Sequence, residues 1–273
     1  MAYEAILYDV ADCICTITLN RPEKLNAWTH QMHLDLKHAM HEAGRDPDVR
    51  AIILTGAGRG FCAGADMGGL QAIGAGARTD RSTKAESSLP GGSTLAEFRM
   101  SYSYFPAIPK FIIAAINGPA AGLGFVIPLY ADLRFAAESA VFTTAFAQRG
   151  LIAEHGVSWL LPRLVGLPAA LDLLCSARKF RAPEALAMGL VSRLIPDGKL
   201  MAETRAYATL LANTVSPRSV AVMKRQIWEA EFQTLAEATT QANHEMDLSF
   251  QTADFKEGVA HFLEKRAARF TGR

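Results

Sequence analysis

The sequence predicts an α/β protein whose last quarter is built from helices alone. Helical patterns separate three short runs that have the β-branched or apolar composition of strands: 13–20, 50–55 and 111–116. Such alternation of strands and helices is typical of α/β layers. After about residue 196 the strand pattern disappears, which predicts an α/β body followed by an all-helical C-terminal region.

Each predicted element has a local physical reason. The first two runs are bounded by Arg-Pro and Gly signals, and the third is wholly apolar, as expected of a strand buried on both faces. Between 29 and 43, apolar residues fall within an arc of about 100°, which predicts a helix with one face on the core. That stripe consists of Met32, Leu36, Ala39, Met40 and Ala43.

The C-terminal helices carry start signals of their own. They are expected at 199–214, 216–230, 234–250 and from 254 onward. Ser216 followed by Pro217 is an N-cap with proline at the first helical position, and Asp254 has Glu257 three residues on, as in a capping box. Because the chain exceeds the usual single-core domain, we expect an α/β core over 1–195 and a helical oligomerisation region over 196–273.

Length and charge narrow the function classes. The 273-residue chain has 28 Lys and Arg against 27 Asp and Glu, a net charge of +1, and half of its residues are hydrophobic. Such a chain has no general electrostatic attraction to nucleic acid or to an anionic membrane. The uncharged stretch 111–131 contains Gly, Pro and Asn that would leave backbone groups unpaired in lipid. Neither nucleic acid nor a membrane is therefore an expected partner.

The cysteines and one irregular stretch give two further expectations. Four cysteines show no Cys-x-x-Cys spacing, and the N-terminus carries acids where a signal peptide carries basic residues, which predicts reduced thiols and a cytoplasmic location. Residues 74–94 are rich in Gly, Ser, Thr and charges without a period. They predict a surface loop, which is either a lid or an insertion without function.

Glycines directly follow two of the predicted strands. The segment 51–66 (AIILTGAGRGFCAGAD) carries them at 56, 58, 60 and 64, and the segment 111–125 (FIIAAINGPAAGLGF) carries them at 118, 122 and 124. Glycine lets the backbone bend sharply and approach a ligand closely, and the first N–H groups of a following helix are unpaired. Either each corner gives one N–H to the same carbonyl oxygen, or both are tight turns that only reverse the chain.

The first glycine segment also fits a dinucleotide-binding fingerprint, Gly58-x-Gly60-x-x-Ala63. That fingerprint requires a second strand that ends in an acid about 20 residues further on. Asp80 has nearly this spacing, but no strand pattern precedes it. A nicotinamide oxidoreductase is therefore the weaker alternative.

Several short motifs occur together along the chain: NRP at 20–22 with NA at 26–27, GFCAGAD at 60–66, AINGPAAGLG at 115–124, PEA at 183–185 with GLV at 189–191, and FLEKR at 262–266. Together they resemble the crotonase (enoyl-CoA hydratase/isomerase) family over essentially the whole chain. The resemblance implies a crotonase-type spiral of β-β-α units with a helical C-terminal trimerisation region, assembled as a homotrimer or a dimer of trimers. It also implies an acyl-CoA thioester substrate, so that coenzyme A is part of the substrate and neither a separate cofactor nor a metal is expected.

The resemblance assigns an oxyanion hole to two backbone N–H groups, those of Ala65 and Leu123. The family usually has glycine where this chain has Leu123, but the donor belongs to the main chain and only proline would remove it. Asp66 follows the first of these residues and is expected to hold the loop rather than to touch substrate. Forming an enolate concentrates negative charge on the thioester oxygen, and each preorganised donor can contribute roughly 3–4 kcal/mol in a water-poor site.

Coenzyme A is expected, from the resemblance, along the segments from Lys24 to Ala27 and from Ala63 through Asp66 to Met67. Phe262 and Lys265 of a neighbouring subunit are expected to close over the nucleotide. Lysine is a chemically sensible phosphate partner, although most surface lysines are simply solvated.

The acids distinguish this chain from the hydratases that it resembles. Those enzymes carry one glutamate three residues after the second oxyanion-hole residue and another about twenty residues later, where this chain has Val126 and Phe146. Glu154 remains, in a turn where members resembling Δ3,Δ2-enoyl-CoA isomerases carry a single catalytic acid. We therefore expect double-bond isomerisation with Glu154 as the only acid and base. The alternatives are hydration with this single glutamate and a non-catalytic acyl-CoA-binding protein.

Other reactive side chains carry weaker hypotheses. His30, His33, His38 and His41 share the polar side of the predicted 29–43 helix, and a solvated face explains them better than metal binding. The segment from Gly156 to Leu160 lacks the last glycine of a serine-hydrolase elbow. Cys62 has no adjacent base or cation that would make it a nucleophile.

Overall fold

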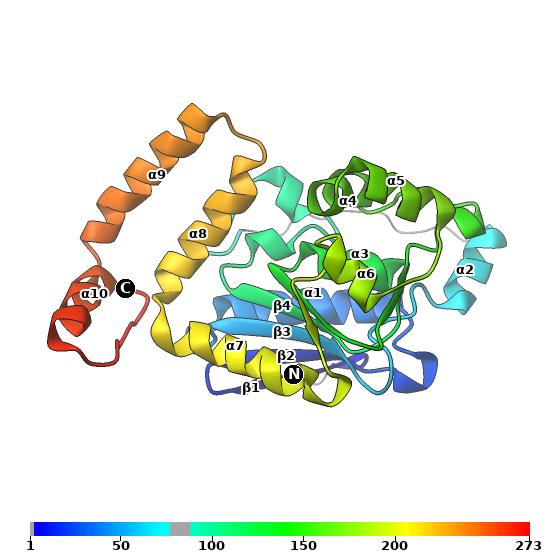
Figure 1. The fold of residues 1–273 in the computed structure, drawn as a ribbon, viewed down its shortest axis with the longest axis horizontal. Helices are drawn as coiled ribbons and strands as arrows, with labels where there is room; N and C mark the ends of the chain where they lie inside the picture. The colour runs from blue at the N-terminus through cyan, green and yellow to red at the C-terminus, as the bar shows by residue number, and fades with distance from the viewer. Residues whose placement is uncertain (1–2, 77–87) are drawn as a thin grey trace.

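The computed structural model describes residues 3–76 and 88–273. A six-stranded sheet has the order β1-β2-β3-β4-β6-β9, and a small three-stranded sheet has the order β5-β7-β8 (Figure 1). The strands are β1 Ile6–Ala11, β2 Ile14–Leu19, β3 Ala51–Gly56, β4 Phe111–Ile116, β5 Ala120–Ala121, β6 Leu133–Ala137, β7 Val141–Thr143, β8 Phe180–Arg181 and β9 Arg193–Ile195. The α-helices are α1 His30–Arg45, α2 Met67–Gly74, α3 Leu123–Val126, α4 Val157–Val165, α5 Leu167–Ser176, α6 Ala182–Ala187, α7 Leu200–Thr214, α8 Pro217–Ala230, α9 Leu235–Phe250 and α10 Ala253–Glu264.

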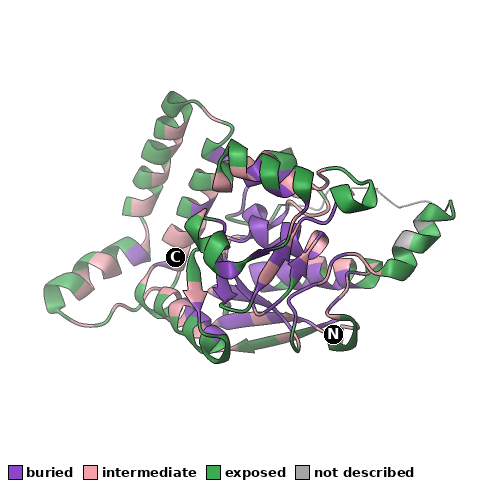
Figure 2. Ribbon diagram, turned by 45° about the vertical axis from the view of Figure 1, so that its right-hand side comes forward, coloured by how far each residue is buried: buried purple, intermediate pink, exposed green. Residues whose placement is uncertain are grey.

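The central strands of the large sheet are buried on both faces. Strand β1 is antiparallel to β2, and every later pair in this sheet is parallel. Alternate residues of β3 and β4 point to opposite sides, so Ile52 and Ile112 enter one apolar cluster while Ile53 and Ile113 enter the other. The larger cluster includes the apolar stripe of α1, and the smaller one includes Leu200 and other residues of α7. Figure 2 shows this buried sheet at the centre of the molecule.

The C-terminal helices leave the body in sequence. Helix α7 shares the smaller core cluster with the sheet, whereas α9 and α10 extend away from it (Figure 1). Helix α8 is anchored by a buried ion pair of 2.8 Å between the Nζ atom of Lys224 and the Oδ2 atom of Asp132. The predicted division between a core over 1–195 and a helical region over 196–273 stays a prediction. Helix α7 belongs to the second range but packs against the sheet of the first.

Local sequence signals predicted β2, β3, β4, α1 and the helices from α7 to α10, whereas the strands from β5 to β9 and the helices from α4 to α6 were not predicted. The strand predicted at 111–116 has those bounds, and the predicted strands at 13–20 and 50–55 correspond to β2 and β3. Ser216 caps α8, where its hydroxyl accepts a hydrogen bond from the Ser219 N–H. Strand β1 was not predicted; it is an edge strand, and most of its residues are not buried.

The predicted capping box at Asp254 is wrong. Thr252 caps α10, its hydroxyl accepting from the Phe255 N–H, and Glu257 instead pairs with Arg266. A capping box is present at α9, between Thr234 and Glu237. Of the loop predicted at 74–94, residues 77–87 lie outside the described part of the chain.

Candidate active site

The two glycine-rich corners lie against each other. The N–H groups of Phe61 and Cys62 both donate to the carbonyl of Pro119, at 3.1 Å, and the Ala121 N–H donates to the carbonyl of Cys62 at 3.0 Å. Cys62 and Ala120 thereby form a parallel bridge between the segments that follow β3 and β4. Segments almost sixty residues apart in the chain are joined at this point.

Two glycines make this close approach sterically feasible. A Cβ atom on Gly64, whose φ is +92°, would lie 2.8 Å from the carbonyl oxygen of Ala121. A Cβ atom on Gly124 would lie 2.1 Å from the carbonyl oxygen of Cys62. Because no side chain tolerates such distances, glycine is required at both positions.

The two amides expected to form the oxyanion hole belong to residues next to this contact in the chain. Among the described residues, the N–H groups of Ala65 and Leu123 have no hydrogen-bond acceptor. Ala65 and Trp28 form a parallel β-bridge whose hydrogen bonds involve the residues on either side of Ala65. The Trp28 N–H donates to the carbonyl of Gly64, and the Asp66 N–H donates to the carbonyl of Trp28. Leu123 is the first residue of α3, where an amide has no intrahelical partner.

Two asparagine side chains hold the first corner in shape. The Nδ2 group of Asn26 donates to the carbonyls of Ala57 and Gly60, at 2.9 and 2.8 Å. The Nδ2 group of Asn117 donates to Gly56 and Gly58, each at 2.9 Å. The sequence analysis assigned no structural role in this corner to either asparagine, although asparagine next to a glycine loop is a signal for such side-chain-to-backbone bonds.

Asp66 holds its loop as expected. Its carboxylate accepts hydrogen bonds from the Arg21 guanidinium at 3.1 Å and from the Gly68 N–H at 3.0 Å, just before α2 begins. These hydrogen bonds, with that from Arg21 the stronger effect, lower the pKa of the Asp66 carboxyl. Arg21 also donates to the carbonyl of Ala27 at 2.6 Å, which ties the segment that ends at Ala27 to the end of the first corner.

Glu154 lies in the turn before α4, with its side chain 28% exposed. Its Oε2 atom is 3.7 Å from the Nε2 atom of His155, whose ring makes an edge contact with Tyr102 at 4.4 Å between centroids. The Tyr102 ring is 6.2 Å from that of Trp28, the residue paired with Ala65. Burial raises the pKa of Tyr102, and the negative charge of Glu154 adds to this effect. Tyr102, which sequence reasoning missed, thus links the Glu154 turn to the first corner.

The two positions at which related hydratases carry glutamate are apolar and buried. Val126 lies in α3, Phe146 directly precedes the 3-10 helix Ala147–Arg149, and both belong to the larger core cluster. Neither can accept or donate a proton.

The residues expected to contact coenzyme A are only partly assembled in one chain. The segment from Lys24 to Ala27 lies next to the segment that begins at Ala63, because the Ala63 N–H donates to the carbonyl of Leu25. Lys24 and Met67 are exposed, whereas Ala27, Ala63 and Asp66 are half-buried. Phe262 is in α10 and Lys265 follows it directly, and α10 lies at the opposite end of the molecule from α2 (Figure 1). Their expected role concerns a neighbouring subunit and stays a prediction.

The other sequence hypotheses fare differently. The expectation of a solvated histidine face is wrong for His41, which is buried and whose Nδ1–H donates to the carbonyl of Lys37 at 2.8 Å. The segment after Gly60 is extended rather than helical until Met67, which does not fit the dinucleotide fingerprint. Burial raises the pKa of the Cys62 thiol to about 12, as expected of an inert cysteine. Residues 3–76 and 88–273 contain no cluster of three metal-ligating side chains and no helix long and apolar enough to cross a bilayer.

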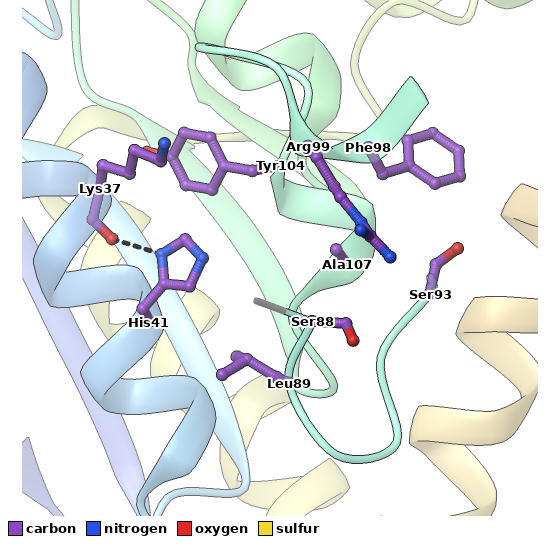
Figure 3. Close-up of a pocket in the computed structure, with 9 residues that line it drawn as sticks. All are labelled: Lys37, His41, Ser88, Leu89, Ser93, Phe98, Arg99, Tyr104 and Ala107. Carbon is purple, nitrogen blue, oxygen red and sulfur yellow. Dashed lines mark hydrogen bonds between the residues drawn. The ribbon is translucent and has the colours of Figure 1, made fainter. Parts of the chain in front are cut away.

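A separate cavity of about 20 Å³ lies beside α1, with room for little more than a water molecule (Figure 3). Lys37, His41, Arg99 and Tyr104 are among the residues that line it. None of the predicted site residues does so, and we do not regard this cavity as the active site.

Comparison with known proteins agrees with the predicted family and fold. The family model described as enoyl-CoA hydratase/isomerase matches residues 9–273. The chain is 36% identical to the 1,2-epoxyphenylacetyl-CoA isomerase of Escherichia coli K12, with 99% of each protein covered. It is 38% identical to a probable enoyl-CoA hydratase of Rhodobacter capsulatus, with 100% of each covered. The crystal structure of a putative enoyl-CoA hydratase from Streptomyces coelicolor A3(2) matches with a TM-score of 0.87 and 34% identity, covering 100% of this chain and 96% of that one.

The mixed α/β body with its helical C-terminal region therefore has the crotonase fold, as predicted. The chain belongs to the enoyl-CoA hydratase/isomerase family.

Proposed function

We propose that the protein isomerises enoyl-CoA thioesters by moving a proton with Glu154 alone. The observation that supports this proposal is that Glu154 is half-buried, whereas Val126 and Phe146 occupy the positions of the two hydratase acids and are buried and apolar. Isomerisation adds nothing to the substrate, so one group can both remove and return the proton. Hydration must activate water and deliver a proton, which favours two groups. The Escherichia coli relative is named an isomerase of an epoxide-containing acyl-CoA, which supports isomerisation of an acyl-CoA in general and not a double-bond shift in particular.

In the proposed reaction, the Glu154 carboxylate removes a proton from the α-carbon of a 3-enoyl-CoA. The electron pair moves onto the thioester oxygen, where the N–H groups of Ala65 and Leu123 stabilise the enolate charge. As the electrons return, the protonated Glu154 gives the proton to the γ-carbon, and the double bond shifts from the β,γ to the α,β position. Coenzyme A would lie along the segments 24–27 and 63–67.

The test compares Glu154→Gln with the wild-type enzyme on 3-hexenoyl-CoA and crotonyl-CoA. The amide cannot take the proton, so isomerisation should fall at least about 100-fold, the lower range for a general acid or base. Glu138→Gln serves as the matched control, because Glu138 is exposed and follows β6 outside the proposed site. Unchanged turnover of both substrates by Glu154→Gln would remove Glu154 from the mechanism.

Hydration with Glu154 alone is the second candidate, and the name of the Rhodobacter capsulatus relative favours it. Faster conversion of crotonyl-CoA to the 3-hydroxy product than of 3-hexenoyl-CoA to its isomer would support it. A non-catalytic acyl-CoA-binding protein is a third reading. It would bind butyryl-CoA without exchanging the α-protons for deuterium, and such exchange would exclude it.

We also propose that the chain assembles as a homotrimer or a dimer of trimers. Large apolar side chains on α9 and α10 are exposed in the single chain, including Leu235 at 85%, Phe262 at 78% and Leu263 at 73%. Burying such a surface against other copies would remove it from water. Light scattering during gel filtration distinguishes a monomer, a trimer and a hexamer. All four cysteines are free thiols, which supports the proposed cytoplasmic location.

A further inference from the structure

Tyr130 connects the two parts of the proposed site through one hydrogen bond. Its hydroxyl donates to the backbone carbonyl of His155, with 2.7 Å between the oxygens. The Tyr130 side chain is buried, and burial raises the pKa of its phenol to about 12. The phenol therefore stays protonated and able to donate at any pH at which the enzyme would work.

The position of Tyr130 in the chain gives this bond its significance. It is the last residue of the 3-10 helix η4, Ile127–Tyr130, which continues directly from α3. The first residue of α3 is Leu123, whose amide is one of the two proposed oxyanion donors. A short, continuously helical segment thus runs from this donor to the Tyr130 hydroxyl.

The accepting end of the bond lies in the turn that carries Glu154. His155 has a φ of +57° and Gly156 a φ of +77°, so two successive residues adopt the left-handed conformation. For His155 this conformation is costly, and surrounding contacts must maintain it. The Val157 N–H donates to the carbonyl of Glu154 at 3.1 Å, and the Tyr130 hydroxyl holds the next carbonyl, that of His155.

Gly156 is fitted to this arrangement. A Cβ atom at Gly156 would lie 2.4 Å from the Tyr130 hydroxyl oxygen but 3.7 Å from its ring carbon Cζ. The hydroxyl alone therefore requires glycine here on grounds of space, beyond the requirement set by the positive φ.

We propose that Tyr130 is a positioning residue that fixes the Glu154 carboxylate relative to the Leu123 amide. This inference rests on the proposed function, in which Glu154 moves the proton and the Leu123 N–H stabilises the enolate. Enolate formation requires both groups to reach one thioester at the same time, one at its α-carbon and the other at its oxygen. The Tyr130 hydrogen bond adds a direct link between them that helps to set that spacing, and small misplacements are costly to rate.

The first test is Tyr130→Phe, assayed with 3-hexenoyl-CoA beside wild type, Glu154→Gln and the control Tyr207→Phe. Tyr207 lies in α7 and packs on the opposite face of the sheet, so its hydroxyl is remote from the proposed site. We expect Tyr130→Phe to lower kcat about tenfold or more, with KM within about twofold, because a misplaced base slows proton transfer while substrate contacts persist. The kinetic isotope effect with α-dideuterated substrate should not decrease. Tyr207→Phe should keep the wild-type kcat.

A general loss of folded protein would also lower the apparent kcat while leaving KM and the isotope effect unchanged, so kcat is expressed per folded enzyme, which requires the folded fraction of each variant. Circular dichroism at the assay temperature measures that fraction directly. Wild-type kcat in Tyr130→Phe, with activity abolished in Glu154→Gln, would overturn the positioning role and leave the proposed function standing. Wild-type turnover in Glu154→Gln would overturn both.

The second test checks the contact itself through stability. Gly156→Ala should lower the melting temperature more in the wild-type background than in Tyr130→Phe, because the phenylalanine lacks the oxygen with which the new Cβ atom collides. The strain of the positive φ is common to both backgrounds and cancels in the comparison. Equal losses in the two backgrounds would show that the hydroxyl does not lie against this turn, which would overturn the inference.

Discussion

Leu123→Pro tests the proposed oxyanion hole by removing the N–H group of one donor residue. The Leu123 amide has no acceptor among the described residues, so the substitution breaks no hydrogen bond that the structure contains. Leu123 is the first residue of α3, where proline is well tolerated. The preceding Gly122 has φ +52° and ψ −118°, outside the α region that a following proline disfavours.

The expected effect on rate is large compared with the effect on stability. Loss of one oxyanion donor costs about 2.7–4 kcal/mol of transition-state stabilisation, or a factor of roughly 10²–10³ in kcat. Leu123→Ala is the matched control, because it truncates the same side chain but keeps the amide. The difference between the two variants therefore isolates the N–H group from the side-chain packing that both of them lose.

The assay is the isomerisation of 3-hexenoyl-CoA, followed by the absorbance of the conjugated product. Thermal unfolding and binding of butyryl-CoA show whether each variant is folded and able to bind a thioester. A folded Leu123→Pro enzyme with kcat within threefold of Leu123→Ala would refute the role of this amide, whatever the reaction proves to be.

Two further predictions concern stability. In Asp66→Asn, the ion pair with Arg21 is lost, which should cost less than about 1 kcal/mol at neutral pH because the pair is partly exposed. The folded-state pKa of Asp66 is lowered, so its contribution is present above the unfolded value of about 3.9 and disappears as pH falls through the lower folded value. Urea unfolding at pH 7 and below pH 3 should show the difference shrinking; a difference that persisted in acid would contradict this cause. Lys224→Met leaves Asp132 buried without its cation, which should cost about 3–5 kcal/mol in urea unfolding. The double variant with Asp132→Asn should recover much of that loss, and a double variant as unstable as the single one would show that the unpaired charge is not the reason.

Local signals explain why much of the fold was predictable. The strand at 111–116 is wholly apolar and is bounded by charged and turn residues, so its limits are set by its own composition. Ser216 caps α8 through a hydrogen bond to an amide three residues away, a contact that any chain with this local sequence can make. Capping at α10 was mispredicted because Thr252 and Asp254 both have side-chain oxygens that can cap a helix. The Asp254 carboxylate instead accepts hydrogen bonds from the N–H groups of Thr271 and Gly272.

The candidate site was predictable only where the type of a residue, such as a glycine or an acid, indicates its role. Glycines after two strands indicated two bends, and the resemblance drew attention to Glu154 once Val126 and Phe146 were found in place of acids. Tyr102 carried no such signal, because an isolated tyrosine in an irregular segment is compatible with many positions. His41 was assigned to a solvated face from helical periodicity, which cannot reveal that Tyr104, from another part of the chain, stacks on its ring.

The sequence by itself determined the helix near 29–43, the C-terminal helices, three buried strands, the two glycine corners and the absence of carboxylates at two positions, because these depend on residue type and on neighbours a few positions away. Only the tertiary structure decided that the corners touch through Gly64 and Ala121, and that the Tyr130 hydroxyl reaches the turn of Glu154. Distances between residues far apart in the chain depend on how whole elements pack, and no local pattern encodes that packing.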